Sequence, residues 1–305
     1  MPQQLDSKSL DFLLSNVNAF IFDADGVLWL GDTVIPGSPQ FIEHLLSKGK
    51  TVIVLTNNSS RSRNYIVEKL HCLGYTGLAK ENVVTPGVIL VDLLKTKFCC
   101  DKNVYLIGSD GLNEEFEAGG IKCFGHGPSL IPENEIDDDV FLNEDSILYR
   151  NHLRTDVGAV IVGFDKYFNY VKLLLATNYL QNSKCLFFGT NEDETSPGPC
   201  RNTVIPDTGP ILAAVKLASG RTPLIVGKPS TFAFEYIAKH WNLRPENALM
   251  IGDRLNTDIC FGKENNLKTL LVLSGSHTLA DLQSYHNNPK MVPDYISPCL
   301  GSLIN

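Results

Sequence analysis

Four short apolar runs, each followed at once by polar or charged residues, constrain the fold of this 305-residue chain most strongly. The runs occupy residues 19–22, 52–55, 224–226 and 248–251. Short runs rich in Val and Ile are typical of strands that are buried on both faces of a parallel sheet. Helical patterns lie between them, at residues 40–48, 62–73, 231–241 and 258–265. This alternation predicts a doubly wound, Rossmann-like α/β domain.

A second and smaller α/β alternation interrupts the first. Residues 104–107, 157–163 and 185–188 predict strands, and residues 111–118 and 167–180 predict helices. Residues 100–208 also carry the whole acidic excess of a chain whose formal net charge is −8. We therefore predict a core formed by residues 1–99 and 209–305, with a smaller α/β domain inserted at residues 100–208.

Composition excludes several classes of protein. No apolar stretch approaches the roughly 18 residues that a membrane helix needs, and the first twenty residues show no secretory signal. The 8 cysteines form no C-x-x-C pair and show no zinc-site spacing, so we expect reduced thiols and a cytoplasmic protein. An acidic chain without a basic run is a poor nucleic-acid binder, and we expect neither a nucleic-acid nor a membrane partner.

Chemically active side chains follow each of the four apolar runs. In open α/β sheets the ligand crevice lies beyond the carboxyl ends of the strands, so these side chains are expected to meet at one site. In chain order they are Asp23, Asp25, Thr56, Asn57, Asn58, Lys228 and Asp253.

The residue types in this set predict the ligand. Asp23 and Asp25 are two residues apart in an extended chain, so both can face one ligand, and charges that close require a cation or a shared proton. Gly26 allows a sharp turn and is expected to expose its N–H to an anion. Three carboxylates, Lys228 and neutral donors suit Mg²⁺ together with a phosphate group.

Four segments together resemble the ordered motifs of the haloacid dehalogenase phosphatase superfamily. They are Asp23-Ala-Asp-Gly-Val27, Thr56-Asn-Asn58, Lys228-Pro229 and Gly252-Asp-Arg-Leu-Asn-Thr-Asp258. The long insertion between the second and third motifs resembles the large α/β cap of some members. Within the superfamily the chain looks most similar to eukaryotic phosphoglycolate and p-nitrophenyl phosphatases, with pyridoxal phosphate phosphatases as near relatives.

The resemblance implies a role for each site residue. Asp23 is the expected nucleophile, and Asp25 the acid that protonates the leaving group and then the base that activates water. The side chains of Asp23 and Asp253 and the backbone carbonyl of Asp25 are expected to bind Mg²⁺. Asp258 is expected to orient Lys228 or metal-bound water, although it could simply occupy the first turn of a helix. The phosphoryl oxygens are assigned to Thr56, Asn57, Asn58, Lys228 and the N–H of Gly26.

Substrate choice is expected to come from the cap loop at residues 190–195. Asn191 and Asp193 resemble the phosphoglycolate-type loop, Glu194 and Thr195 depart from it, and the loop lacks a histidine associated with the pyridoxal phosphate branch. We therefore expect small phosphorylated metabolites, with two-carbon phosphates preferred over pyridoxal phosphate. The alternatives are a pyridoxal phosphate or protein phosphatase and a catalytically silent binding protein, against which the three intact acids argue. The resemblance also implies a homodimer.

Overall fold

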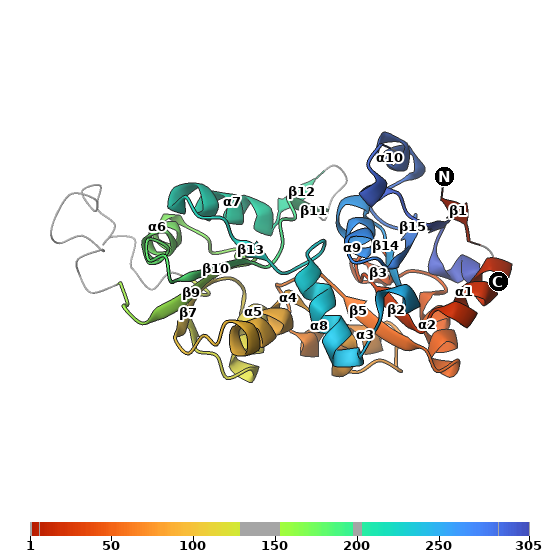
Figure 1. The fold of residues 1–305 in the computed structure, drawn as a ribbon, viewed down its shortest axis with the longest axis horizontal. Helices are drawn as coiled ribbons and strands as arrows, with labels where there is room; N and C mark the ends of the chain where they lie inside the picture. Colours follow the sequence, from red (N-terminus) through yellow and green to blue (C-terminus); the bar gives the residue numbers. More distant parts are fainter. Residues whose placement is uncertain (1, 6, 129–152, 198–202, 286, 305) are drawn as a thin grey trace. The chain divides into compact units, whose positions relative to one another are not determined.

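The computed structural model describes residues 2–5, 7–128, 153–197, 203–285 and 287–304 (Figure 1). The chain divides into two compact units, each described below by itself. The larger unit comprises Met1–Asn57, Arg63–Thr85 and Gly227–Asn305. The smaller unit comprises Asn58–Ser62 and Pro86–Val226, a wider span than the predicted insertion at residues 100–208.

The larger unit is built on a seven-stranded sheet in which every neighbouring pair of strands is parallel. Its order is β1 (Gln3–Gln4), β16 (Tyr295–Ser297), β15 (Lys268–Val272), β14 (Ala248–Gly252), β2 (Ala19–Phe22), β5 (Thr51–Leu55) and β6 (Val83–Val84). Three of the four predicted runs are thus adjacent: β2 lies between β14 and β5, with Ala19 in register with both Ala248 and Thr51. The doubly wound α/β prediction is confirmed.

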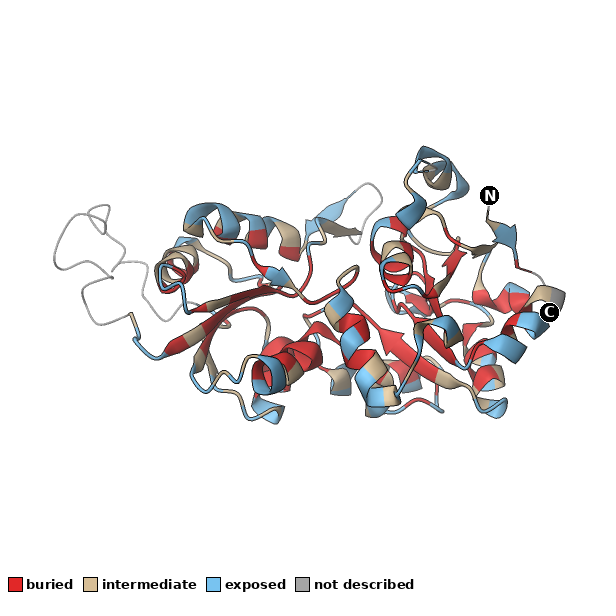
Figure 2. Cartoon of the chain, viewed as in Figure 1, coloured by how far each residue is buried: buried red, intermediate tan, exposed pale blue. Residues whose placement is uncertain are grey.

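Helices cover both faces of this sheet because alternate strand residues face opposite sides. Phe20 and Phe22 share one buried cluster with side chains of α1, α2 and α3. On the other face, α9 approaches the sheet where Gly262 lies against Met250. The central strands of this sheet are buried, whereas its edge strand β1 is exposed (Figure 2). The helices of the unit are α1 (Ser7–Asn16), α2 (Ser38–Ser47), α3 (Arg63–Cys72), α8 (Thr231–Trp241), α9 (Cys260–Glu264) and α10 (Leu279–Ser284).

Local sequence sets the helix bounds. The side chain of Ser230 accepts a hydrogen bond from the N–H of Phe232 and caps α8, which ends where Asn242 takes a left-handed conformation with φ of 50°. The helix predicted at residues 258–265 begins instead as a π-helical turn, Leu255–Ile259, that leads into α9. Short 3₁₀ turns occupy Lys80–Asn82, Pro245–Asn247, Pro289–Met291 and Leu300–Leu303, and β3 (Trp29–Leu30) pairs with β4 (Thr33–Val34) in a small hairpin.

The smaller unit has its own parallel sheet, in the order β13 (Leu224–Ile225), β10 (Leu186–Gly189), β9 (Val157–Val162), β7 (Asn103–Ile107) and β8 (Cys123–Phe124). Helices α4 (Pro86–Asp92) and α5 (Asp110–Ala118) pack together, as do α6 (Tyr170–Tyr179) and α7 (Thr208–Ser219) (Figure 1). A π-helical turn, Leu93–Lys97, follows α4, and β11 (Thr195–Pro197) pairs antiparallel with β12 (Val204–Pro206). The predicted strands and helices of this segment are confirmed.

Two sequence expectations fail in detail. The run at residues 224–226 was expected in the large sheet, but β13 pairs with β10 of the smaller sheet, because a two-residue strand carries too little pattern to choose its partner. The helix predicted to start at residue 167 starts at Tyr170, because the side chain of Asn169 caps it by accepting from the N–H of Lys172.

Within the described residues, no helix is long and apolar enough to cross a membrane. Their seven cysteines are all free thiols, and Cys200 lies outside the described residues.

Candidate active site

The predicted site lies at the carboxyl edge of the large sheet. Asp23 and Asp25 follow β2, Thr56 and Asn57 follow β5, and Asp253 follows β14. Because these three strands are parallel neighbours, the segments that follow them emerge at the same edge.

Three buried carboxylates meet at this edge. Asp23, Asp253 and Asp258 each offer an oxygen, and these oxygens lie within 4.8 Å of one another. The Nζ of Lys228, which is 2 % exposed, donates to Asp23 Oδ1 at 2.6 Å and pairs with Asp258 Oδ1 at 2.8 Å. It also donates to the main-chain oxygen of Leu55 at 3.0 Å. One ammonium group among three carboxylates leaves the cluster with an excess of negative charge.

The cluster fits a divalent cation. Oδ2 of Asp253 accepts from the N–H of Ser276 at 2.6 Å, whereas its Oδ1 is buried and accepts no hydrogen bond from the described residues. A buried carboxylate oxygen without a partner is costly unless a ligand binds it. Oxygen atoms from carboxylates are the protein ligands that Mg²⁺ prefers, so the donor set suits this ion.

Two glycines leave room for Asp253. A Cβ on Gly26 would lie 2.3 Å from Asp253 Oδ2, and a Cβ on Gly275 would lie 2.1 Å from the same oxygen. Gly26 has a positive φ of 83°, which glycine adopts without strain. Its N–H, expected to face an anion, donates instead to the main-chain oxygen of Trp29 at 2.7 Å. In this structure the loop itself uses that donor.

Burial and mutual repulsion set the protonation of the cluster. Burial raises the pKa of Asp23 well above its usual value, and the charges of Asp258 and Asp253 raise it further, against the opposing effect of Lys228. Burial, with the charge of Asp258, raises the pKa of Asp253 to about 6. Burial alone would lower the pKa of Lys228, but Asp23 and Asp258 outweigh it, so the pKa is raised and the ammonium stays charged.

Asp25 has a different environment from Asp23. Its side chain is exposed, and Oδ1 accepts a hydrogen bond of 2.8 Å from the indole Nε1 of Trp29. The protein around the carboxyl still raises its pKa by partial desolvation, while the bond from Trp29 and the charges of Lys69 and Lys228 oppose the rise. Two carboxyls separated by one residue therefore have different partners, as an acid–nucleophile pair requires.

The side chain of Asn57 holds the backbone of Lys228. Its Oδ1 accepts from the N–H of Lys228 at 2.8 Å, and its Nδ2 donates to the carbonyl of Lys228 at 3.1 Å. The peptide bond from Lys228 to Pro229 is cis. Asn57 thus links the end of β5 to a lysine 171 positions away in the sequence. Thr56, also buried, donates its N–H to Val84.

Asn58 and Asn191 belong to the smaller unit. Oδ1 of Asn58 accepts from the N–H and the hydroxyl of Ser60, at 2.9 and 2.7 Å. Asn191 is 1 % exposed, and its Oδ1 accepts from the N–H of Asp193 at 3.0 Å. Their roles toward a substrate stay predictions.

Sequence reasoning missed three parts of the site: the indole of Trp29, the carbonyl of Leu55 and the loop at residues 274–276. Ser274 donates to the carbonyl of Gly26 at 2.8 Å, and Ser276 binds Asp253 as described above. One signal was present, because Ser274-Gly-Ser276 is a further polar cluster close behind an apolar run, that of β15.

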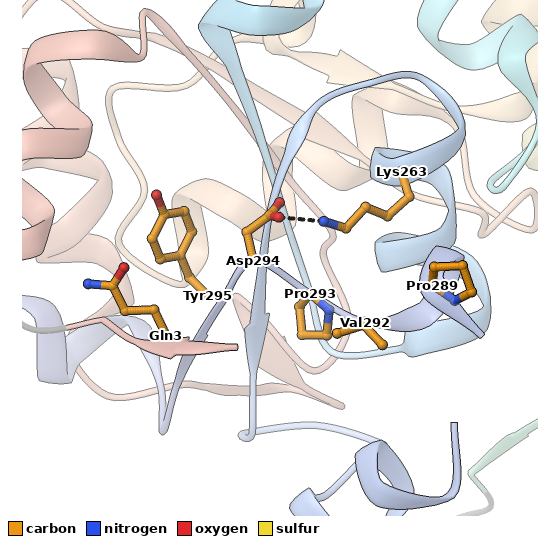
Figure 3. Close-up of a pocket in the computed structure, with 7 residues that line it drawn as sticks. All are labelled: Gln3, Lys263, Pro289, Val292, Pro293, Asp294 and Tyr295. Atoms are coloured by element: carbon orange, nitrogen blue, oxygen red, sulfur yellow. Dashed lines mark hydrogen bonds and ion pairs between the residues drawn. The ribbon is translucent and has the colours of Figure 1, made fainter. Parts of the chain in front are cut away.

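A separate cavity of about 480 Å³ also lies in the larger unit (Figure 3). Its charged groups already have partners: Lys263 pairs with Asp294, whose Oδ2 accepts from the N–H and hydroxyl of Thr269 at 2.9 and 2.8 Å. The acidic cluster does not line this cavity. Because the charged side chains that line it are already paired with one another, we do not assign the catalytic site to it. The lining residues are Gln3, Lys263, Pro289, Val292, Pro293, Asp294 and Tyr295.

Comparison with known proteins agrees with this geometry. Residues 20–122 match the model of the haloacid dehalogenase-like hydrolase family, and residues 225–299 match a second model described as HAD-hydrolase-like. The glycerol-3-phosphate phosphatase of Mus musculus is 36% identical, over 99% of this chain and 94% of its own. Phosphoglycolate phosphatase 1A, chloroplastic, of Arabidopsis thaliana is 36% identical, over 99% of this chain and 80% of its own.

Solved structures share the fold. The 4-nitrophenylphosphatase of Thermotoga maritima matches with a TM-score of 0.75 and 31% identity, over 95% of this chain and 97% of its own. The glycerol phosphate phosphatase of Mycobacterium tuberculosis, solved in complex with magnesium, matches with a TM-score of 0.74 and 25% identity, over 95% of this chain and 77% of its own. The chain belongs to the haloacid dehalogenase-like hydrolases, as its motifs predict, and is a phosphoric monoester hydrolase of that family.

Proposed function

We propose that this hydrolase is a Mg²⁺-dependent phosphatase for phosphate monoesters of small two- or three-carbon alcohols, of the phosphoglycolate or glycerol phosphate type. The observation that carries the proposal is the buried group of Asp23, Asp253 and Asp258 around the ammonium of Lys228. Relatives named for glycerol-3-phosphate and for phosphoglycolate support the substrate class without choosing between the two.

Mg²⁺ would be held by the side chains of Asp23 and Asp253 and by the backbone carbonyl of Asp25. The unpartnered Oδ1 of Asp253 supports this assignment, and so does the magnesium complex of the M. tuberculosis relative. When bound, the ion neutralises negative charge on the phosphoryl oxygens and on the attacking carboxylate.

In the proposed reaction, a carboxylate oxygen of Asp23 attacks phosphorus. The new O–P bond forms while the bond from phosphorus to the alcohol oxygen breaks, and the carboxyl of Asp25 gives its proton to the departing oxygen. Asp25, now ionised, then takes a proton from water, which attacks phosphorus and releases inorganic phosphate from Asp23. Lys228 holds Asp23 by the 2.6 Å hydrogen bond and neutralises charge throughout.

Asp258 is proposed to orient Lys228. Its Oδ1 pairs with Nζ of Lys228 at 2.8 Å, and its Oδ2 accepts from the N–H groups of Asp253 and Arg254 at 3.1 and 3.0 Å. These bonds fix the carboxylate at the start of the turn that follows β14. Thr56, Asn58 and Asn191 are retained as proposed contacts to substrate.

A steady-state assay tests the proposed function. Purified protein should hydrolyse p-nitrophenyl phosphate with Mg²⁺, lose activity in EDTA and recover it when Mg²⁺ is restored. Asp23→Asn should abolish turnover, whereas Asp11→Asn, at an exposed residue of the same unit, should not. Absence of turnover with Mg²⁺ would favour the silent binding protein, and residual activity in Asp23→Asn would reject the assigned nucleophile.

A panel of phosphate esters tests which alcohol the preferred substrate carries. We expect kcat/KM for phosphoglycolate and glycerol 3-phosphate to exceed that for pyridoxal phosphate and for a phosphopeptide, because the loop at residues 190–195 lacks a histidine. The reverse ranking would favour the pyridoxal phosphate or protein phosphatase. The cytoplasmic location and the homodimer stay predictions, and two relatives from Arabidopsis thaliana have names that include the word chloroplastic.

A further inference from the structure

We infer that Trp29 is a positioning residue for the acid–base carboxyl of Asp25, an inference that rests on the proposed function. The indole Nε1 donates to Asp25 Oδ1 at 2.8 Å. An indole N–H can only donate, so the oxygen that faces it must act as an acceptor. In the neutral carboxyl the proton is therefore directed to Oδ2, the oxygen that Trp29 does not bind.

The backbone holds Trp29 firmly enough for this role. The N–H of Gly26 donates to the carbonyl of Trp29 at 2.7 Å, and the N–H of Trp29 donates to the carbonyl of Ala24 at 3.3 Å. Asp25 and Trp29 also form an isolated β-bridge. Trp29 is only 3 % exposed, although Asp25 next to it is exposed. An exposed residue thus has its carboxyl bound by a buried donor whose backbone is itself hydrogen-bonded.

Lys69 of α3 secures the indole from outside. Its Nζ lies 4.8 Å from the centroid of the Trp29 ring, within the range of a cation–π contact. The same Nζ donates to the carbonyl of Gly31 at 2.7 Å and lies 3.7 Å from Asp32 Oδ1. Lys69 therefore fixes both the ring and the tip of the β3–β4 hairpin that carries it.

The role predicts a loss that depends on the leaving group. An alkoxide needs a proton as it departs, whereas p-nitrophenolate is stable enough to leave without one. Trp29→Phe keeps an aromatic ring but removes the donor. We expect kcat/KM for glycerol 3-phosphate to fall about tenfold, the effect of one hydrogen bond to an ionisable group, while kcat/KM for p-nitrophenyl phosphate stays within about twofold.

Two controls separate positioning from general damage. Competitive inhibition by inorganic phosphate should be unchanged in Trp29→Phe, because the indole does not touch the phosphoryl site. In an Asp25→Ala background, Trp29→Phe should cost nothing further with either ester. Equal losses for both esters, or none, would overturn the inference. A wild-type protein that hydrolyses neither ester would instead reject the proposed function.

Two further measurements decide the matter even where Trp29→Phe does not fold. Lys69→Met should give the same ester-selective loss, of about twofold to fivefold, while Lys48→Met, at an exposed lysine outside this contact, should not. Trp29 and Trp241 are the only two tryptophans, so Trp241→Phe leaves Trp29 as the sole indole emitter. In that background and without metal, Asp25→Ala should shift the emission, whereas Asp11→Ala should not. An unchanged emission maximum, or a Lys69→Met loss that is equal for both esters, contradicts the inference.

Discussion

Replacing Asn57 by alanine separates two roles that this residue could have. The side chain makes two hydrogen bonds to the backbone of Lys228, which is 2 % exposed. Each bond contributes about 1 kcal/mol, so Asn57→Ala should lower the free energy of unfolding by about 2 kcal/mol, and by more if both backbone groups stay dry. The ammonium of Lys228 then loses its support, and a displacement of about 1 Å of a catalytic group costs about 100-fold in kcat.

The matched control is Asn265→Ala. Asn265 is as buried as Asn57, at 7 % against 8 % exposed, and its Nδ2 donates to the carbonyl of Phe261 at 2.8 Å, away from the acidic cluster. The Asn265→Ala variant should have a free energy of unfolding lower by about 1 kcal/mol and an unchanged kcat. Urea unfolding and steady-state kinetics with p-nitrophenyl phosphate give both quantities.

The kinetic parameter that changes identifies the role. If Asn57 holds Lys228, kcat falls while inhibition by inorganic phosphate changes little. If its side chain instead binds the phosphoryl group, as the motif resemblance implies, phosphate inhibition weakens and KM rises. A kcat as high as that of Asn265→Ala would refute the reasoning from the two hydrogen bonds.

Two other predictions follow from the acidic cluster. The folded state raises the pKa of Asp253 from 3.8 to about 6 and also raises that of Asp23, so the folded chain holds protons that the unfolded chain releases. The metal-free protein should therefore lose stability as the pH rises from about 4 through 6, and Mg²⁺ should oppose the loss; a melting temperature that rises over this interval without metal contradicts the assignment. Gly275→Ala would place a Cβ 2.1 Å from Asp253 Oδ2, so we expect kcat to fall at least about tenfold and the Mg²⁺ requirement to increase. Gly49→Ala strains a backbone with a φ of 69°, but its Cβ meets nothing within 4 Å, so it should keep both values, and equal activity of the two variants would contradict the crowding.

The acidic cluster and the Trp29 contact give the carboxyls of Asp23 and Asp25 different surroundings. Asp23 is buried beside Lys228 and shares its site with two other carboxylates, whereas Asp25 is exposed and bound by an indole. Asp23 and Asp25 have one residue between them in the sequence, but the side chains that bind them, Lys228 and Trp29, come from different segments. This difference allows one carboxyl to attack while the other carries a proton.

Local patterns in the sequence were enough for the fold class and for most elements. Short Val-rich runs predict buried strands because only a strand covered on both faces tolerates unbroken apolar residues. The polar residues that end β2, β5 and β14 predicted a common edge, since parallel strands all point the same way. The ordered motifs identified the family, which the comparisons confirm.

Only the tertiary structure decided which groups touch. The pairing of β13 with β10, the two bonds from Asn57 to Lys228 and the donation from Gly26 to Trp29 depend on distances between segments that no local pattern encodes. The state of the Asp253 carboxylate is also decided by tertiary contacts. The N–H of Ser276 donates to Oδ2, whereas Oδ1 accepts no hydrogen bond from the described residues. Residue types determine which chemistry is available, because charge and donor count belong to the side chain. Packing determines which atom performs it, because hydrogen bonds and desolvation act only over a few ångströms.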